Sequence, residues 1–353
     1  MRISRRDFLK AAAAVTAAGG LTPAVLAKLA RILRGEGNPR VIWLQGAGCD
    51  GCAVSFLNSV HYATADDLLV NTLDVEFHNN LSAAAGDLAV SAVQAAGAQP
   101  GYVLVIEGAI PTGAAGKYCR LWPGTSMHDG VVQFAQNAGF IIALGACAAY
   151  GGTPAGAPNP TEAKGVGEIL GSDPRLINVP GCPSHPDWLV GTIAYLLANG
   201  YAPPLDAHRR PLAYFGRLIH DNCFKRRRYC GQGVFASQLS DQGCMEFLGC
   251  KGKHTRSDCY MRKWNSGGDG EYGVNWCIGA RSPCLGCVEP TFPDGMSPFY
   301  VHLPAEKQSE DGKSADQGQE GVSAPPTLRR PDARPSLKAD DLRGALDAHD
   351  HHH

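Results

Sequence analysis

The sequence predicts an α/β fold, in which a doubly wound parallel sheet is followed by a loop-rich, cysteine-rich segment. Over the first 200 residues, short apolar runs alternate with helix-like stretches, which is the pattern of a parallel sheet with crossover helices. Eight of the 13 cysteines fall between residues 220 and 287, where little apolar patterning is left. A chain of 353 residues has room for both parts.

Five apolar runs are the predicted strands, and four other stretches are the predicted helices. The strands are residues 41–46, 68–77, 102–106, 140–144 and 176–179. The helices are residues 53–61, 81–96, 131–138 and 187–198. The order of these elements predicts a flavodoxin-like domain over residues 36–200.

The N-terminus is typical of an export signal. Residues 4–10 (SRRDFLK) form a twin-arginine motif, and an Ala-rich apolar run follows over residues 11–27. A membrane anchor is the alternative, but Gly19, Gly20 and Pro23 interrupt a run that is short for a span. We therefore expect residues 1–35 to be a signal peptide. Because this route exports folded proteins, it favours metal centres over disulfides for the cysteines.

Four cysteines lie in loops that directly follow three of the predicted strands. They are Cys49, Cys52, Cys147 and Cys182. Since parallel strands end at one edge of the sheet, the fold predicts that these thiols converge on a metal site. A thioredoxin-like pair of Cys49 and Cys52 would leave the other two unexplained, while zinc also accepts four thiolates. No nucleotide-binding loop is supported, because residues 113–117 (GAAGK) are followed by tyrosine.

The segment over residues 201–303 contains two further groups of possible ligands. One group is Cys259, Cys277, Cys284 and Cys287, and the other is His220, Cys223, Cys244 and Cys250. Thiolate softness and the number of sites favour iron–sulfur clusters over zinc. A neutral imidazole in place of a thiolate should raise the potential of the last group.

Two cysteines are left over by this division of the chain, Cys119 and Cys230. We expect Cys119 to be a buried free thiol. Three cluster sites without a substrate-binding motif indicate an electron relay. The net charge of −1 gives no indication of nucleic-acid binding.

Seven segments of this chain resemble the small subunit of nickel–iron hydrogenases, over residues 41–300. They are residues 49–52 (CDGC), 107–111 (EGAIP), 145–152 (GACAAYGG), 180–188 (PGCPSHPDW), 220–223 (HDNC), 248–252 (LGCKG) and 284–290 (CLGCVEP). The resemblance implies a proximal 4Fe-4S cluster on the first four cysteines. It implies a medial cluster on the group with Cys277 and a distal cluster on the group with His220.

Several residues refine this resemblance. Many relatives have proline in place of Cys277 and a medial 3Fe-4S cluster, so the fourth thiol implies 4Fe-4S, as in the nickel–iron–selenium branch. Residues 292–295 (FPDG) and 297–300 (SPFY) also resemble that branch. Gly51 and Gly152 stand where oxygen-tolerant membrane relatives have additional cysteines, which argues against their special cluster. Asp50 replaces the usual threonine, and its charge is expected to lower the proximal potential.

The resemblance implies an electron-transfer subunit with no catalytic residues of its own. It would pass electrons reversibly between dihydrogen, at the nickel–iron site of a separate large subunit, and a periplasmic acceptor such as a c-type cytochrome. We expect residues 225–228 (KRRR) to steer that acceptor. The alternatives are a structural zinc protein and another iron–sulfur electron-transfer subunit without hydrogenase activity.

The tail over residues 304–353 is polar and contains proline, so we expect it to be disordered and to provide no membrane anchor. Its last residues include His349, His351, His352 and His353. We interpret these histidines as an unstructured end rather than a metal site.

Overall fold

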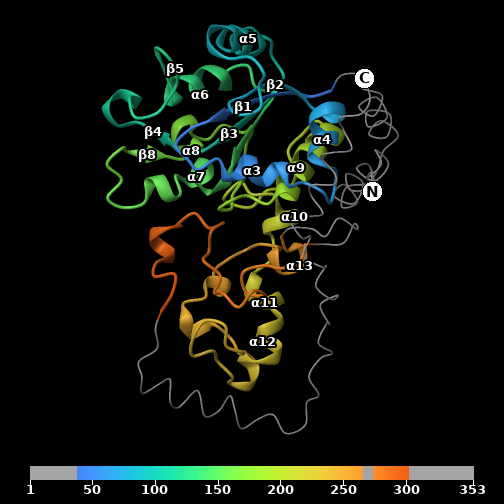
Figure 1. Cartoon of the computed structure of the whole chain (residues 1–353), viewed down its shortest axis with the longest axis vertical. Helices are drawn as coiled ribbons and strands as arrows, with labels where there is room; N and C mark the ends of the chain where they lie inside the picture. The colour runs from blue at the N-terminus through green and yellow to red at the C-terminus, as the bar shows by residue number, and fades with distance from the viewer. Residues whose placement is uncertain (1–37, 265–272, 302–353) are drawn as a thin grey trace, which may run out of the picture. The chain divides into compact units, whose positions relative to one another are not determined.

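A computed structural model describes residues 38–264 and 273–301 of the chain (Figure 1). The predictions for the signal peptide and the tail lie outside these residues. Within the described parts, every helix is too short or too polar to cross a membrane.

The core of the fold is a five-stranded sheet in the order β2-β1-β3-β7-β9. Its strands are β1 Arg40–Gln45, β2 Asp74–His78, β3 Val103–Glu107, β7 Phe140–Leu144 and β9 Leu176–Val179. All four neighbouring pairs are parallel. Because both faces are covered, the strands are almost continuous apolar runs, which is why the sequence identified most of them.

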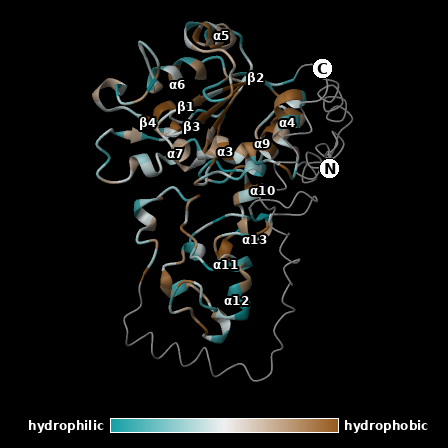
Figure 2. Cartoon of the chain, viewed as in Figure 1, coloured by the Kyte–Doolittle hydropathy of each residue, from teal (hydrophilic) through white to brown (hydrophobic). Residues whose placement is uncertain are grey.

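Helices cover both faces of this sheet, so the fold class is α/β, as predicted. The main helices are α3 Gly51–Leu57, α5 Gly86–Ala98, α6 Met127–Ala135 and α9 Pro186–Asn199. On one face, Trp43 and Val105 belong to the same apolar core as Trp188 of α9. On the other face, Leu104 packs in a core with Phe134 of α6. Figure 2 shows this concentration of apolar residues in the strands and in α9.

Shorter elements complete this part of the chain. The helices are α4 Ala65–Asp67, the π-helix η1 Leu68–Thr72, α7 Gly145–Tyr150 and α8 Val166–Leu170, with 3-10 turns η2 Gly113–Gly116 and η3 Thr153–Ala155. Two antiparallel pairs join β4 Ile110–Pro111 to β8 Ala163–Lys164 and β5 Arg120–Trp122 to β6 Thr125–Ser126. The sequence did not indicate these two-residue and three-residue strands.

The strand predicted over residues 68–77 is wrong in its first half, because η1 occupies that half and only β2 is extended. The amide of Leu73 donates to the carbonyl of Leu68 at 2.8 Å, which closes the π-helical turn. Asn71 Nδ2 donates to Asp67 Oδ1 at 2.8 Å and supports the same turn. A short apolar run does not distinguish helix from strand by periodicity alone.

After residue 200 the described chain has short helices and turns, with isolated bridges in place of strands. The helices are α10 Leu212–Phe215, α11 Ile219–Asn222, α12 Phe224–Arg228 and α13 Cys259–Arg262, and the 3-10 turns are η4 Cys230–Gln232, η5 Glu246–Leu248, η6 Lys251–Lys253 and η7 Asp294–Met296. Its apolar clusters are small, and Cys223 and Cys284 are themselves members of one of them. Apolar packing is therefore scarce where the sequence predicted that ligands replace a core.

Candidate metal-cluster sites

The carboxyl ends of the parallel strands bring the first group of cysteines together. Cys49 and Cys52 follow β1, Cys147 lies in α7 after β7, and Cys182 follows β9. The loop after β1 lies where the strand order reverses, between β1 and β3. This is the position at which doubly wound sheets bind their ligands.

Hydrogen bonds between these loops fix the cysteines relative to one another. The amide of Ser184 donates to Cys52 Sγ at 3.4 Å, and Ser55 Oγ of α3 donates to the carbonyl of Ser184 at 2.7 Å. The amide of Ala146 donates to the carbonyl of Gly181 at 2.8 Å. Gly145 has a φ of +84°, and a Cβ at that position would lie 2.5 Å from Cys52 Sγ. Only glycine allows this approach.

The four thiols are close enough to influence one another's ionisation. Burial, followed by the charge of Glu107, raises the pKa of Cys52, and the charges of Cys147 and Cys182 act in the same direction. Burial and then the charge of Cys182 raise the pKa of Cys147 to about 11, with a further contribution from Cys49. Cys49 and Cys182 are the exposed members of the group.

Glu107 at the end of β3 is a buried carboxylate beneath this group, and the sequence analysis assigned it no role. Its Oε1 accepts from the amides of Cys52 and Ala53, both at 3.0 Å. Its Oε2 accepts from Trp43 Nε1 at 3.0 Å and from Gln45 Nε2 at 3.4 Å. Burial raises the pKa of Glu107, while these donors act to lower it. A charged residue that ends a buried strand at this edge was the available signal.

The structure also brings the four cysteines of the second group together. Burial, followed by the charges of Cys287 and Cys250, raises the pKa of Cys284. Burial raises the pKa of Cys287 to about 12, with contributions from the charges of Cys277 and Cys182. Burial and the charges of Cys287 and Cys284 likewise raise the pKa of Cys259. Cys277, the predicted fourth thiol of this group, therefore lies within electrostatic reach of Cys287.

The third group surrounds a cavity. All four predicted ligands line it, namely His220, Cys223, Cys244 and Cys250. Burial and the positive charges of Arg226 and Lys253 lower the pKa of His220, which favours the neutral imidazole that a metal requires. Lys225 also lines the cavity, but its side chain is only 4% exposed and its Nζ donates to the carbonyl of Gly243 at 2.9 Å.

Adjacent groups contact each other through single residues. The amide of Cys284, in the second group, donates to Cys250 Sγ, in the third group, at 3.3 Å. Cys182, in the first group, lies near Cys287, in the second group. The backbone of Cys182 forms a hydrogen bond that lowers the pKa of the Cys287 thiol, and the charge of the Cys182 thiolate raises it. The second group therefore lies between the other two.

The remaining two cysteines differ in their surroundings. All 13 cysteines are free thiols. Cys119 is half-buried against the apolar core of α6, so it is less enclosed than we expected. Cys230 lies beside Cys244 of the third group, a contact that the sequence spacing did not reveal.

A buried ion-pair network joins the first and second groups. Arg262 of α13 contacts Asp187 of α9 and Asp258 at N–O distances of 2.8 Å each. Trp188 Nε1 donates to Asp258 Oδ1 at 2.8 Å. Arg262 lies three residues after Cys259, and Asp187 lies five residues after Cys182. The network therefore fixes the loops of the two groups relative to each other.

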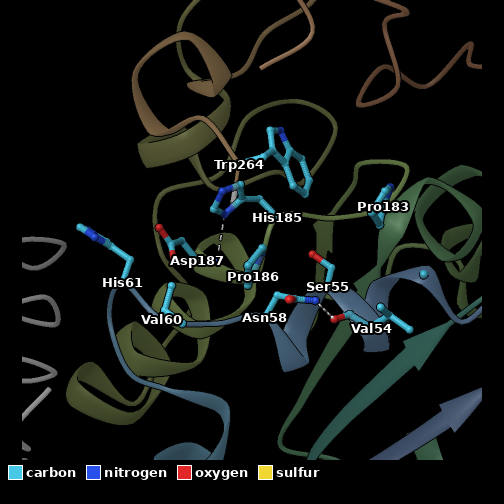
Figure 3. Close-up of a pocket in the computed structure, with 11 residues that line it drawn as sticks. Val54, Ser55, Asn58, Val60, His61, Pro183, His185, Pro186, Asp187 and Trp264 are labelled. Atoms are coloured by element: carbon cyan, nitrogen blue, oxygen red, sulfur yellow. Dashed lines mark hydrogen bonds between the residues drawn. The ribbon is translucent and has the colours of Figure 1, made fainter. Parts of the chain in front are cut away.

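A pocket opens beside the exposed edge of the first group (Figure 3). Val54 of α3 and Asn58, the residue that follows this helix, line one wall, and Pro183, His185 and Trp264 line the other. The His185 ring packs against Trp264 with a centroid separation of 4.6 Å. His185 Nε2 donates to the carbonyl of Lys263 at 2.6 Å, which holds the ring in place. The neighbouring Val54 is 57% exposed.

Comparison with known protein families identifies three matches along the chain. Residues 2–22 match the twin-arginine translocation signal sequence. Residues 49–196 match the family of the NADH ubiquinone oxidoreductase 20 kDa subunit. Residues 215–300 match the C-terminal domain of the NiFe/NiFeSe hydrogenase small subunit.

Individual relatives agree with these matches. The periplasmic NiFeSe hydrogenase small subunit of Desulfomicrobium baculatum is 37% identical over 322 residues, which cover 85% of this chain and 99% of the relative. The periplasmic NiFe hydrogenase small subunit 1 of Nitratidesulfovibrio vulgaris is 39% identical over 84% of this chain and 93% of its own length. The solved structure of the reduced, active NiFeSe hydrogenase from Desulfomicrobium baculatum aligns with a TM-score of 0.70 at 38% identity, covering 75% of this chain and all of that chain.

These comparisons show that the chain is a subunit of a hydrogenase. Within that class, it belongs to the NiFe/NiFeSe hydrogenase small subunit family. The predicted family and the twin-arginine signal are confirmed, and the protein is periplasmic.

Proposed function

We propose that this chain is the electron-transfer subunit of a hydrogenase heterodimer, relaying electrons reversibly between dihydrogen at the large subunit and a periplasmic acceptor. The observation that supports the proposal is the order of the three predicted ligand groups, in which the second group contacts both of the others. Cys182 lies near Cys287, and Cys250 accepts a hydrogen bond from the amide of Cys284. An ordered series of closely spaced redox sites is what a relay requires.

The donor atoms fit three iron–sulfur clusters. Twelve residues offer free thiols or, at His220, an imidazole of lowered pKa. Cys49, Cys52, Cys147 and Cys182 would hold a proximal 4Fe-4S cluster, Cys259, Cys277, Cys284 and Cys287 a medial one, and His220, Cys223, Cys244 and Cys250 a distal one. Such clusters supply one-electron transfer when they are bound.

The residues around these sites have defined tasks. Glu107 fixes the amides that follow Cys49 and holds the start of α3 against the sheet. The network of Arg262 fixes the spacing of the proximal and medial ligands. The small apolar cluster that contains Cys223 and Cys284 would limit the access of water to the medial and distal sites. Low solvent access is one determinant of cluster potential.

We propose two domains for the relay. Residues 36–200 form a flavodoxin-like domain, and residues 201–303 form a domain that holds the medial and distal sites. The strand order β2-β1-β3-β7-β9 supports the first assignment, since it is the order of flavodoxin-like sheets. The second is supported by residues 201–264 and 273–301, in which no strand is found.

We infer that the large subunit covers the exposed edge of the proximal site. Cys49 and Cys182 are exposed there, and the adjacent pocket is lined by the exposed apolar residue Val54 of α3. Leu57, the last residue of the same helix, is also exposed. Exposed apolar groups around a pocket are typical of interaction surfaces. The relatives are named as small subunits, which agrees with the existence of a large-subunit partner.

The acceptor would approach the distal site, where α12 presents exposed arginines. Arg226 is paired with Asp221 at 2.7 Å, while Arg227 and Arg228 are exposed. The prediction that all of residues 225–228 steer a partner needs a correction, because Lys225 is buried by its bond to Gly243. We propose a c-type cytochrome with an acidic patch as the acceptor.

Reversing the charge of Arg227 tests this surface. We expect Arg227→Glu to slow electron transfer to an acidic cytochrome roughly 3- to 10-fold at low ionic strength, because steering of the encounter is weakened. The difference should vanish near 1 M salt, where screening acts over about 3 Å. Stopped-flow rates measure the effect, and Arg120→Glu on β5 is the matched control. Equal rates for both variants at low salt would exclude a steering role.

The proposed function is tested on the heterodimer, purified anaerobically after production with its large subunit. We expect iron and acid-labile sulfide, a visible iron–sulfur absorbance, and dihydrogen-dependent reduction of a viologen dye. The small subunit alone should show no such activity. Zinc in place of iron in the purified protein would favour the structural zinc alternative and refute the relay.

A further inference from the structure

Cys230 is the one cysteine outside the three ligand groups that lies at a proposed cluster site. It begins the turn η4, which Tyr229 separates from α12. Its Sγ, the Sγ of Cys244 and a carboxylate oxygen of Glu246 all lie within 4.8 Å of one another. Cys244 is one of the four predicted distal ligands and is buried.

The surroundings of Cys230 hold it in this position. Its Sγ donates to Glu246 Oε2 at 3.7 Å. The other oxygen of Glu246 pairs with Lys253, and both of these side chains line the same cavity as the distal ligands. The positive charge of Lys253 offsets the negative charge of this carboxylate. Glu246 is therefore a weaker hydrogen-bond acceptor for the S–H group of Cys230.

Binding of a cluster would change which group, Glu246 or Cys244, is the better hydrogen-bond acceptor for the S–H group of Cys230. A ligating Cys244 must be deprotonated, so its sulfur becomes a negatively charged acceptor next to the Cys230 thiol. Hydrogen bonds to ligand sulfurs favour the reduced, more negative state of a cluster and so raise its potential. Four other ligands already complete the site, which leaves Cys230 free to act as a donor.

We propose that Cys230 is a positioning residue of the distal site, whose S–H group donates to Cys244 Sγ and raises the reduction potential of the distal cluster. The inference rests on the proposed function, because it requires a distal cluster on Cys244. It assigns a task to a thiol that the ligand groups leave unused.

The test is a redox titration of the purified heterodimer, with the distal cluster monitored by electron paramagnetic resonance. In Cys230→Ala, we expect the ratio of reduced to oxidised distal cluster at a fixed potential to fall by up to roughly tenfold, the upper end for one hydrogen bond. For a one-electron couple, tenfold corresponds to about 59 mV. Cys230→Ser keeps a donor and should restore most of the potential. Iron content should not change in either variant.

Cys119→Ala is the matched control, since it removes the other left-over thiol, which packs against the core of α6. If the distal cluster of Cys230→Ala had the wild-type potential, this inference would be overturned and the proposed function would still stand. Loss or conversion of the distal cluster in that variant would also overturn it, because Cys230 would then be a ligand. A wild-type heterodimer without a distal cluster would overturn the proposed function and this inference with it.

Discussion

Replacing Arg262 by methionine is expected to lower the free energy of unfolding of the subunit by about 3–5 kcal/mol, the cost of removing one partner from a buried ion pair. Arg262 is 4% exposed, and its loss would leave Asp187 and Asp258 buried without their cation. The two carboxylates lie in different segments, one on α9 and one directly before α13. The variant should therefore also loosen the junction between the proximal and medial ligands.

The measurement is the urea-induced loss of iron–sulfur absorbance in the heterodimer. Arg217→Met replaces an exposed arginine on the same part of the chain and should change stability by less than about 0.5 kcal/mol. If both variants lost absorbance at the same urea concentration, the network would not hold the two groups together.

Replacing Cys277 by proline is expected to convert the medial cluster from 4Fe-4S to 3Fe-4S, with the loss of one iron atom per subunit. Cys277 contributes the fourth thiol of its group, and its charge raises the pKa of Cys287. Because the converted cluster has one ligand thiolate fewer, its potential should rise. Iron analysis and the electron paramagnetic resonance signal of the oxidised heterodimer measure the change.

Cys119→Ala serves as the control for cysteine removal in this experiment. An unchanged iron content and an unchanged spectrum in Cys277→Pro would show that Cys277 is not a ligand. The medial assignment would then fail while the assignments of the proximal and distal sites stood.

The sequence predicted the parallel sheet and the convergence of its cysteine loops for the same reason. Strands that are buried on both faces are apolar throughout, so the runs at 140–144 and 176–179 coincide with β7 and β9. Parallel strands then place Cys49, Cys147 and Cys182 at one edge. The strand predicted at 68–77 is wrong in its first half because the same local composition also suits a helical turn.

The features that escaped prediction depend on partners distant in the sequence. Arg262 contacts Asp187 across 75 residues, and Glu107 accepts from the amide of Cys52 across 55 residues. The sequence predicted Lys225 as one of four exposed basic residues, but its side chain is buried and bonds to the carbonyl of Gly243. Cys230 meets Cys244 only through the path of the intervening loop. Spacing alone does not encode such contacts.

The scarcity of apolar packing after residue 200 bears on the timing of biogenesis. In the described residues after 200, these clusters contain two to five buried apolar residues each, too few to order this part of the chain without help from ligated metal. The unloaded chain should therefore remain an open, protease-sensitive segment. Since the twin-arginine signal directs folded cargo, insertion of the clusters in the cytoplasm would act as the checkpoint that releases the subunit for export.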